Sequence, residues 1–226
     1  MLTVIIPTWN EAENLGAVLD GLRPTGARVI VVDDGSPDGT PELAAAHGAE
    51  VLSGSGKAGL GRAYLRGFQH ALATGADPIV QMDGDGSHAP TDVPRLLAAL
   101  ADADLALGSR YVPGGGTERW PWHRRALSRF GTRYAALWLG LPYRDLTGGF
   151  KAWRASLLRR LDLETVSSEG YAFQVEMTWR AARADARIAE IPIVFVERAH
   201  GVSKMSAKIA GEAALRVPSL RWGGRR

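Results

Sequence analysis

The chain has 226 residues, of which 46% are hydrophobic and 23% charged, enough for one α/β domain with a sizeable core. The absence of cysteine excludes a disulfide framework, a thiol nucleophile and any cysteine-ligated metal. The net charge of +3 conceals two opposite halves: residues 1–118 carry 7 Lys or Arg against 15 Asp or Glu, and residues 119–226 carry 20 against 9. This division predicts a cation site in the first half and an anion site in the second, with solubility alone as the alternative.

Short apolar runs alternate with helical patterns along the first half of the chain. The apolar runs predict strands, mostly buried on both faces, at 2–6, 28–33, 49–53, 78–82 and 104–108. The intervening spacing predicts helices over 12–23, 40–47, 59–74 and 91–101. The alternation favours an α/β fold with a mostly parallel, doubly wound sheet, helices on both faces, and ligands at the carboxyl ends of the strands.

A basic amphipathic stretch follows the glycine-rich loop at 113–116. Apolar side chains recur there at helical spacing beside a ridge of arginines: Leu127, Phe130, Tyr134, Leu137, Trp138 and Leu141, with Arg125, Arg129 and Arg133. Together with Trp120 and Trp122, the stretch 119–133 suits an anionic lipid surface. A helix that packs on the core with a solvated rim is the alternative. A helix over 171–184, a strand pair around 188–196 and a terminal helix near 205–217 complete the prediction.

Polar side chains follow the first two predicted strands. Trp9 comes after the first strand and can stack on a base, whereas Asp34 follows the second and can accept a hydrogen bond from a base or a ribose. Helix capping by Asn10 or Asp38 is the alternative explanation for part of this polarity.

The fourth strand ends in the most specific pattern of the chain. Asp83 and Asp85 are separated only by Gly84, and carboxylates this close raise each other's pKa unless a cation intervenes. Mg²⁺ or Mn²⁺ suits oxygen ligands and also binds substrate phosphates, and glycine lets the backbone approach a ligand closely. A surface turn rich in Asp and Gly is the alternative.

Residues 54–59 match the pattern G-x-G-x-x-G and lie between a predicted strand and helix. A dinucleotide fingerprint normally lies after the first strand, whereas this one follows the third. Ala58 also stands where a P-loop needs Ser or Thr. A mobile glycine loop over a phosphate is therefore the better interpretation.

Basic residues of the later part of the chain are candidate anion ligands: Arg110, Arg124, Arg198 and Lys204. Arginine and lysine are the side chains that phosphates require, and arginine binds them bidentately. Taken singly, each is more often a solvated surface charge, so their combination carries the argument.

Several motifs in order resemble the inverting GT-A glycosyltransferases of family 2: 7–11, 32–40, 59–61 and 82–85. Later motifs narrow the resemblance to the polyprenol/dolichol-phosphate mannosyltransferases: 108–111, 145–150, 170–177, 196–198 and 201–205. The resemblance implies a GT-A catalytic domain over 1–206, with a nucleotide and metal half at 1–118 and an acceptor half at 119–206. It leaves 207–226 as a C-terminal helix and basic tail without a transmembrane domain.

The resemblance implies metal-dependent, inverting transfer of mannose from GDP-mannose to a polyprenyl phosphate, which yields a lipid-linked β-mannose donor. The residues expected to bind the nucleotide sugar are Pro7, Trp9, Glu11, Val32, Asp34, Asp83, Gly84, Asp85, Arg198 and Lys204. Arg110, Arg124 and Ser128 are expected to bind the acceptor phosphate. Asp83, Asp85 and Arg110 are the expected catalytic residues. Asp83 and Asp85 would hold Mg²⁺ or Mn²⁺, with Ser87 as a further candidate ligand.

Three residues depart from the family pattern: Trp9 replaces the usual Tyr, Gly84 replaces Ala, and Ser87 stands where some members use Gln as a metal ligand. Two other functions stay open, namely a family 2 transferase that makes polyprenyl-phosphate glucose from UDP-glucose, and a nucleotide-binding module without turnover. Nucleic acid is not an expected partner, because the basic residues are interleaved with tryptophans near an apolar helix.

The longest weakly charged stretch, 135–143, is far shorter than the roughly 20 residues that span a membrane. The first residues also lack the pattern of a signal peptide. We therefore expect a cytoplasmic protein that associates peripherally with the cytoplasmic face of the membrane. Its expected partners are an anionic membrane surface and, as a further candidate, a separate membrane protein.

Overall fold

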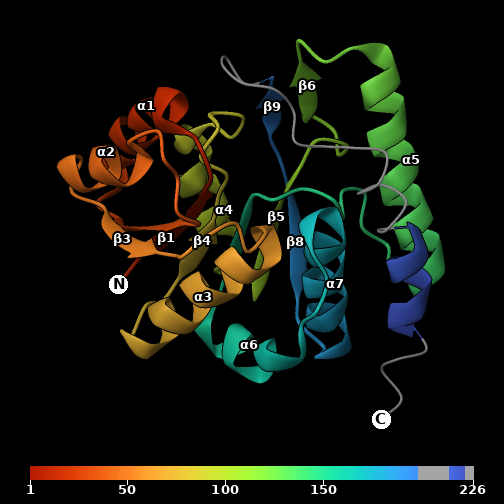
Figure 1. Cartoon of the computed structure of the whole chain (residues 1–226). Helices are drawn as coiled ribbons and strands as arrows, with labels where there is room; N and C mark the ends of the chain where they lie inside the picture. Colours follow the sequence, from red (N-terminus) through yellow and green to blue (C-terminus); the bar gives the residue numbers. More distant parts are fainter. Residues whose placement is uncertain (198–213, 222–226) are drawn as a thin grey trace.

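The computed structural model describes residues 1–197 and 214–221, and its centre is a seven-stranded sheet (Figure 1). The strand order is β3-β2-β1-β4-β7-β5-β8. The strands are β1 (Thr3–Thr8), β2 (Arg28–Asp33), β3 (Glu50–Ser53), β4 (Ile79–Gln81), β5 (Leu105–Ser109), β7 (Lys151–Trp153) and β8 (Ile188–Pro192). Only β7 runs antiparallel, between β4 and β5, so the prediction of a mostly parallel sheet is confirmed.

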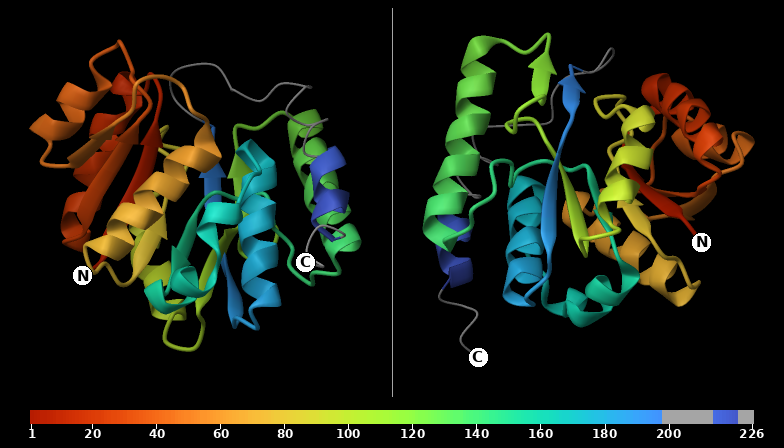
Figure 2. Two further views of the ribbon diagram at one scale, coloured as in Figure 1. Left: turned by 60° about the horizontal axis from the view of Figure 1, so that its bottom comes forward. Right: turned by 180° about the vertical axis from the view of Figure 1, so that it is seen from behind.

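Helices cover both faces of this sheet, as the alternating pattern predicts. One face carries α3 (Leu60–Ala73), α6 (Ala155–Arg160) and α7 (Gly170–Arg183), in front of the sheet in Figure 1. The other carries α1 (Ala12–Leu22), α2 (Thr40–Ala46) and α4 (Val93–Ala99), which face the viewer in the right panel of Figure 2. Short 3₁₀ turns lie at η1 (Arg23–Thr25), η2 (Pro90–Asp92) and η3 (Leu163–Thr165).

The alternation of side chains along β1 divides the core into two layers. Ile5 packs on one face with Tyr64 of α3, whereas Ile6 packs on the other with Leu15 of α1. All four side chains are completely buried. Burial of each such apolar side chain stabilises the fold by about 1.5–3 kcal/mol, and the two layers together fix the strand ends that carry the site.

A second, two-stranded sheet pairs β6 (Gly116–Glu118) in parallel with β9 (Val194–Val196). The prediction that two strands around 188–196 pair with each other is therefore wrong. Both strands exist, but β8 lies beside β5 in the large sheet, and Ile193 separates it from β9. Two consecutive apolar runs indicate two strands, but not which partner each one takes.

The basic stretch forms α5 (Trp122–Leu139), and the helix at 214–221 lies alongside it (Figure 2, left). The hydroxyl of Tyr134 donates to the carbonyl of Ala214 at 2.8 Å, and Val217 is buried with Ala135. Of the helix predicted near 205–217, residues 205–213 lie outside the described residues, and the observed helix continues to 221. None of the helices at 1–197 and 214–221 is long and apolar enough to cross a membrane.

Candidate active site

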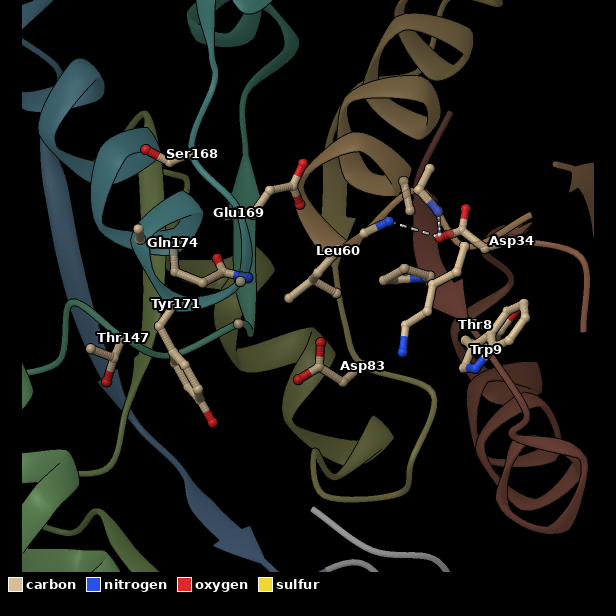
Figure 3. A pocket seen from close by; sticks show the side chains of 18 of the residues that line it. Thr8, Trp9, Asp34, Leu60, Asp83, Thr147, Ser168, Glu169, Tyr171 and Gln174 are labelled. Carbon is tan, nitrogen blue, oxygen red and sulfur yellow. Dashed lines mark hydrogen bonds between the residues drawn. The ribbon is translucent and has the colours of Figure 1, made fainter. Parts of the chain in front are cut away.

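A cavity of about 830 Å³ lies at the carboxyl ends of β1, β2 and β4. Trp9 follows β1, Asp34 follows β2, and Asp83 and Asp85 follow β4, and all four line the cavity. Figure 3 shows Trp9, Asp34 and Asp83 around it. Parallel strands end at the same edge of a sheet, which is where doubly wound folds bind ligands. The predicted convergence of these side chains is present in the structure.

The loop at 54–59 folds back onto Asp34. The Oδ2 atom of Asp34 accepts hydrogen bonds from the backbone N–H groups of Ala58 at 3.0 Å and Gly59 at 3.1 Å (Figure 3). These two N–H groups therefore bind a carboxylate of the chain itself, and the interpretation of the loop as a phosphate cover does not hold for them. The Nζ of Lys57 lies 5.6 Å from the centre of the Trp9 ring, so a cation of this loop does reach the mouth of the cavity.

The second carboxylate oxygen of Asp34 differs from the first in its hydrogen bonding. Its Oδ1 atom is buried and accepts no hydrogen bond from any described residue, although Arg66 lies 3.8 Å away. A buried carboxylate oxygen without a donor suits a hydroxyl or N–H group of a bound nucleoside. Pro7 and Glu11 line the same end of the cavity as Trp9.

The capping alternative holds for Asp38 and not for Asn10. Asp38 accepts hydrogen bonds from the N–H groups of Ala12 at 3.1 Å and Thr40 at 3.1 Å, at the starts of α1 and α2. Asn10 has a left-handed backbone, with φ of 55°, and its own N–H donates to Ser36. Asp38 is thus a structural residue that holds two helix starts together.

Buried groups hold the two carboxylates that follow β4. The hydroxyl of Tyr64 donates to Oδ1 of Asp83 at 2.9 Å, and the backbone N–H of Asp83 donates to Nδ1 of His88 at 3.2 Å. Burial, with the nearby Asp83 charge, raises the pKa of Tyr64 well above its ordinary value. Its hydroxyl therefore stays a hydrogen-bond donor at neutral pH. Oδ1 of Asp85 accepts from the N–H of Ser87 at 3.0 Å.

The donor set fits a divalent cation that is shared with substrate phosphates. Within residues 1–197 and 214–221, no cluster of three or more His, Asp or Glu side chains is arranged to hold a metal. Mg²⁺ commonly binds through one or two carboxylates plus substrate phosphates, and Asp83 and Asp85 supply that number at the cavity wall. Ser87, the further candidate ligand, is buried and does not line the cavity; it holds Asp85 instead.

The structure brings the three predicted acceptor residues together around two aromatic rings. The guanidinium carbons of Arg110 and Arg124 lie 5.5 Å and 4.6 Å from the centre of the Trp120 ring. Tyr111 donates to the hydroxyl of Ser128 at 2.7 Å, and its ring lies 5.3 Å from Arg110. Trp120 is buried, so its expected place on a lipid-facing surface is wrong. Its ring contacts the guanidinium groups of both arginines.

Both arginines have carboxylate partners. Arg110 donates to Asp145 through Nε and Nη2, at 2.7 Å each, and Arg124 pairs with Glu197. Burial opposes the charge of Arg110, but Asp145 raises the pKa of this guanidinium above its ordinary value. The Nη2 atom also donates to Thr147 at 2.9 Å, and Thr147 lines the cavity. Arg110 therefore does not line the cavity itself but is hydrogen-bonded to Thr147, which does.

Some predicted residues have other positions. Val32 is completely buried in β2 with the core and does not line the cavity. Gly84 does line it, and a Cβ there would lie 3.0 Å from Cγ2 of Ile6, so an alanine at this position needs a shift of the Ile6 side chain by a few tenths of an ångström. Arg198 and Lys204 lie outside the described residues.

Sequence reasoning missed the wall of the cavity that α7 and the preceding loop provide: Ser168, Glu169, Tyr171 and Gln174 (Figure 3). Oε2 of Glu169 accepts from the N–H of Gly61 at 3.0 Å, and burial raises the pKa of Glu169. One signal was available, because Gln174 and Glu176 are polar residues within an otherwise apolar stretch of the predicted helix. Buried polar residues of this kind need partners.

Comparison with known proteins agrees with this fold. The family model "Glycosyl transferase family 2" matches residues 3–162. An undecaprenyl-phosphate mannosyltransferase of Micrococcus luteus is 50% identical over 97% of this chain and 92% of its own. A polyprenol monophosphomannose synthase of Mycolicibacterium smegmatis is 47% identical over 97% of this chain and 86% of its own.

Solved structures share the fold at lower identity. A glucosyl-3-phosphoglycerate synthase of Mycobacterium tuberculosis, in complex with Mn²⁺, UDP and glucosyl-3-phosphoglycerate, has a TM-score of 0.71 and 22% identity, covering 99% of this chain and 79% of that one. The mostly parallel sheet with helices on both faces is the GT-A glycosyltransferase fold. The chain belongs to glycosyl transferase family 2.

Proposed function

We propose that this protein transfers mannose from GDP-mannose to a polyprenyl phosphate with inversion, giving polyprenyl-phosphate β-mannose, with Mg²⁺ or Mn²⁺ as cofactor. The names of the two curated relatives support the sugar and the acceptor class. The observation that carries the proposal is the continuity of the site. One cavity contains the Asp83 and Asp85 pair, and its wall at Thr147 is hydrogen-bonded to Arg110.

The donor nucleoside would lie at the end of the cavity formed by Pro7, Trp9, Glu11 and Asp34. The Trp9 ring offers a stacking surface, and Oδ1 of Asp34 offers an acceptor for a nucleoside hydroxyl or N–H group. Lys57, near Trp9, adds positive charge at the mouth. These contacts fix the donor so that its diphosphate reaches Asp83 and Asp85.

A divalent cation, when bound, would neutralise the charge that develops on the leaving nucleoside diphosphate. Asp83 and Asp85 would hold it from the protein side, and the diphosphate from the other. Tyr64 and the backbone of Ser87 keep the two carboxylates in place through the hydrogen bonds they donate. The chain's own contribution to this step is a pair of carboxylates that are already oriented.

The acceptor phosphate would bind at Arg110, Arg124 and Ser128. A lipid phosphate oxygen is anionic at neutral pH, so the attack needs no strong general base. The charge of the fixed Arg110 guanidinium, which lies behind Thr147 of the cavity wall, would help to align that oxygen opposite the leaving diphosphate, and such alignment supplies a large part of the rate. In-line attack on the anomeric carbon inverts it.

The outer face of α5 is the proposed contact with an anionic membrane surface. Trp122, Phe130 and Leu137 are 79%, 66% and 80% exposed. They fall on one side of the helix, with the exposed Arg125, Arg129 and Arg133 next to them. The opposite side packs on the protein through Thr132 and Ala135. The alternative expectation, a helix that packs on the core with a solvated rim, holds for the inner face, and lipid binding by the outer face at the cytoplasmic side of the membrane stays a proposal.

A transfer assay tests the proposal. Purified protein is incubated with GDP-mannose and a short polyprenyl phosphate, with and without Mg²⁺, and lipid-linked mannose is measured. GDP is expected to compete with the donor and UDP is not. Competition by UDP and not by GDP, together with transfer from UDP-glucose, would support a glucosyltransferase instead. Donor binding without transfer or hydrolysis, whether or not EDTA is present, would support a non-catalytic module.

A further inference from the structure

A chain of buried hydrogen bonds crosses the sheet behind the carboxylate pair. The indole Nε1–H of Trp153 donates to Oε1 of Gln81 at 3.2 Å, and Nε2 of Gln81 donates to Oε1 of Gln174 at 2.6 Å. An indole nitrogen can only donate. It therefore fixes the orientation of the Gln81 amide, which in turn fixes that of Gln174, and the group left at the end of the chain is the Nε2–H₂ donor of Gln174.

The backbone of Gln174 is held as firmly as its side chain. Lys151 donates through Nζ to the carbonyl of Gln174 at 2.7 Å and to the hydroxyl of Thr178 at 3.0 Å. Thr178 also donates to the same carbonyl at 3.1 Å. All these side chains are buried. Gln174 is thus fixed at both ends, which leaves its Nε2 little freedom to turn elsewhere.

The Nε2 atom of Gln174 is buried and donates to no atom of the described residues. Figure 3 shows this nitrogen on the side of the amide that faces Leu60 and Asp83. A Cβ on Gly149 would lie 3.1 Å from Oδ2 of Asp83 and 3.4 Å from Nε2 of Gln174. The absent side chain of Gly149 therefore leaves room between a carboxylate and an amide donor. A buried donor without a partner is unfavourable, so the nearby carboxylate is its natural acceptor.

We propose that Gln174 is a positioning residue for Asp83: its Nε2 donates to the Asp83 carboxylate when a divalent cation binds, and so raises the affinity of the site for that cation. The inference rests on the proposed function, because it assigns the cation to Asp83. Tyr64 already holds Oδ1 of Asp83, and Gln174 would hold the carboxylate from the Gly149 side. Residues that orient a ligand in this way typically change metal affinity or activity about 10- to 100-fold when mutated.

A titration of Mn²⁺ onto the protein in the presence of GDP, followed by the electron paramagnetic resonance signal of free Mn²⁺, measures this affinity directly. Gln174→Met keeps the unbranched length and removes the amide. We expect its dissociation constant for Mn²⁺ to rise about 10- to 100-fold. Excess Mn²⁺ should restore the turnover of this variant, because occupancy of the site is what the substitution lowers.

Thr178→Val is the matched control: it removes a hydroxyl from the same buried cluster, while Lys151 still donates to the Gln174 carbonyl and Gln81 still holds its amide. It should bind Mn²⁺ as the wild type does. If Gln174→Met does not fold, Gly149→Ala places a methyl group between Asp83 and Gln174 while the hydrogen bonds of the chain remain, and it should weaken Mn²⁺ binding in the same direction.

Wild-type Mn²⁺ affinity in a folded Gln174→Met protein would overturn the inference, and so would an equal loss of affinity in Thr178→Val, since that would indicate a structural role only. An unchanged Mn²⁺ affinity with a raised KM for the sugar donor would assign Gln174 to the substrate instead. A wild-type protein that binds no Mn²⁺ with GDP would contradict the proposed function itself, and the inference with it.

Discussion

Asp145 accepts three hydrogen bonds from Arg110: one from the backbone N–H at 3.0 Å and two from the guanidinium at 2.7 Å each. Both side chains are buried, at 4% exposure for Arg110 and none for Asp145. This carboxylate belongs to a loop between α5 and β7, whereas Arg110 directly follows β5. The pair therefore ties the loop that carries Thr147 to the proposed acceptor site, and fixes the guanidinium before any phosphate arrives.

Asp145→Ala should destabilise the protein by about 3–5 kcal/mol, because removal of one partner leaves the other charge buried and unpaired. The free energy of unfolding in urea measures this loss. Asp20→Ala is the control, because it breaks the exposed pair with Arg23, and such pairs contribute about 0–1 kcal/mol. Equal losses in the two variants would show that Asp145 does not hold a buried charge.

Asp83→Ala and Asp85→Ala should each abolish metal-dependent transfer, because each removes one of the two carboxylates that the cation is expected to share. Initial rates over a range of Mg²⁺ concentrations measure the effect. Asp20→Ala removes an exposed carboxylate of α1 that pairs with Arg23 and His47, away from the cavity, and it should keep the wild-type rate. Near wild-type turnover in either site variant would refute the metal role.

Lys151 should give the stability a distinctive pH dependence. Burial lowers the pKa of Lys151 to about 7, against the opposing effect of Asp145 and Asp83. Between that value and its ordinary pKa near 10.5, the unfolded chain binds a proton that the folded protein does not, so the free energy of unfolding rises with pH. The rise is at most about 1.4 kcal/mol per pH unit.

Urea unfolding at pH 7, 8 and 9 checks this, with Lys151→Met as the comparison. The difference in free energy between wild type and variant should shift in favour of the wild type as the pH rises. A difference that stays constant across the three pH values would mean that Lys151 keeps its proton in the folded protein.

Substitution of the α5 arginines should weaken binding to anionic vesicles. We compare the triple variant Arg125→Gln, Arg129→Gln and Arg133→Gln with a control that removes the same charge elsewhere, at the exposed Arg23, Arg62 and Arg187. Each basic residue near an anionic surface contributes about 1 kcal/mol. Cosedimentation at low salt should therefore show a large loss for the α5 variant and a small one for the control. Equal losses would indicate attraction by net charge alone.

The proposed donor half of the site was predictable, because its position at the strand ends follows from local patterns. A strand that ends in polar residues places Trp9, Asp34, Asp83 and Asp85 at one edge of a parallel sheet, whatever the details of packing. The acceptor arginines were predictable as charges, but their setting was not. Asp145 and Trp120 contact Arg110 because the chain around α5 and β7 folds onto it. The spacing of residue types along the sequence does not predict such long-range contacts.

Local sequence patterns also did not predict β7 or the wall of the cavity that the second half of the chain provides. β7 has three residues, too few for a periodic pattern, yet its insertion between β4 and β5 brings Lys151 and Trp153 behind the site. The opposite net charges of the two halves of the chain also do not correspond to two separate parts of the site. Glu169, Tyr171 and Gln174 of the second half line the cavity with Asp83, whereas Arg110 of the first half lies against Trp120 in the proposed acceptor site.

The most direct measurement is the formation of polyprenyl-phosphate mannose by the purified protein from GDP-mannose and a short polyprenyl phosphate in the presence of Mg²⁺, with the anomeric configuration of the product determined by NMR. We predict β-linked mannose on the lipid phosphate, lost on addition of EDTA and regained with Mg²⁺ or Mn²⁺. An α-linked product, transfer that persists without any divalent cation, or a requirement for UDP-glucose as the donor would contradict the account.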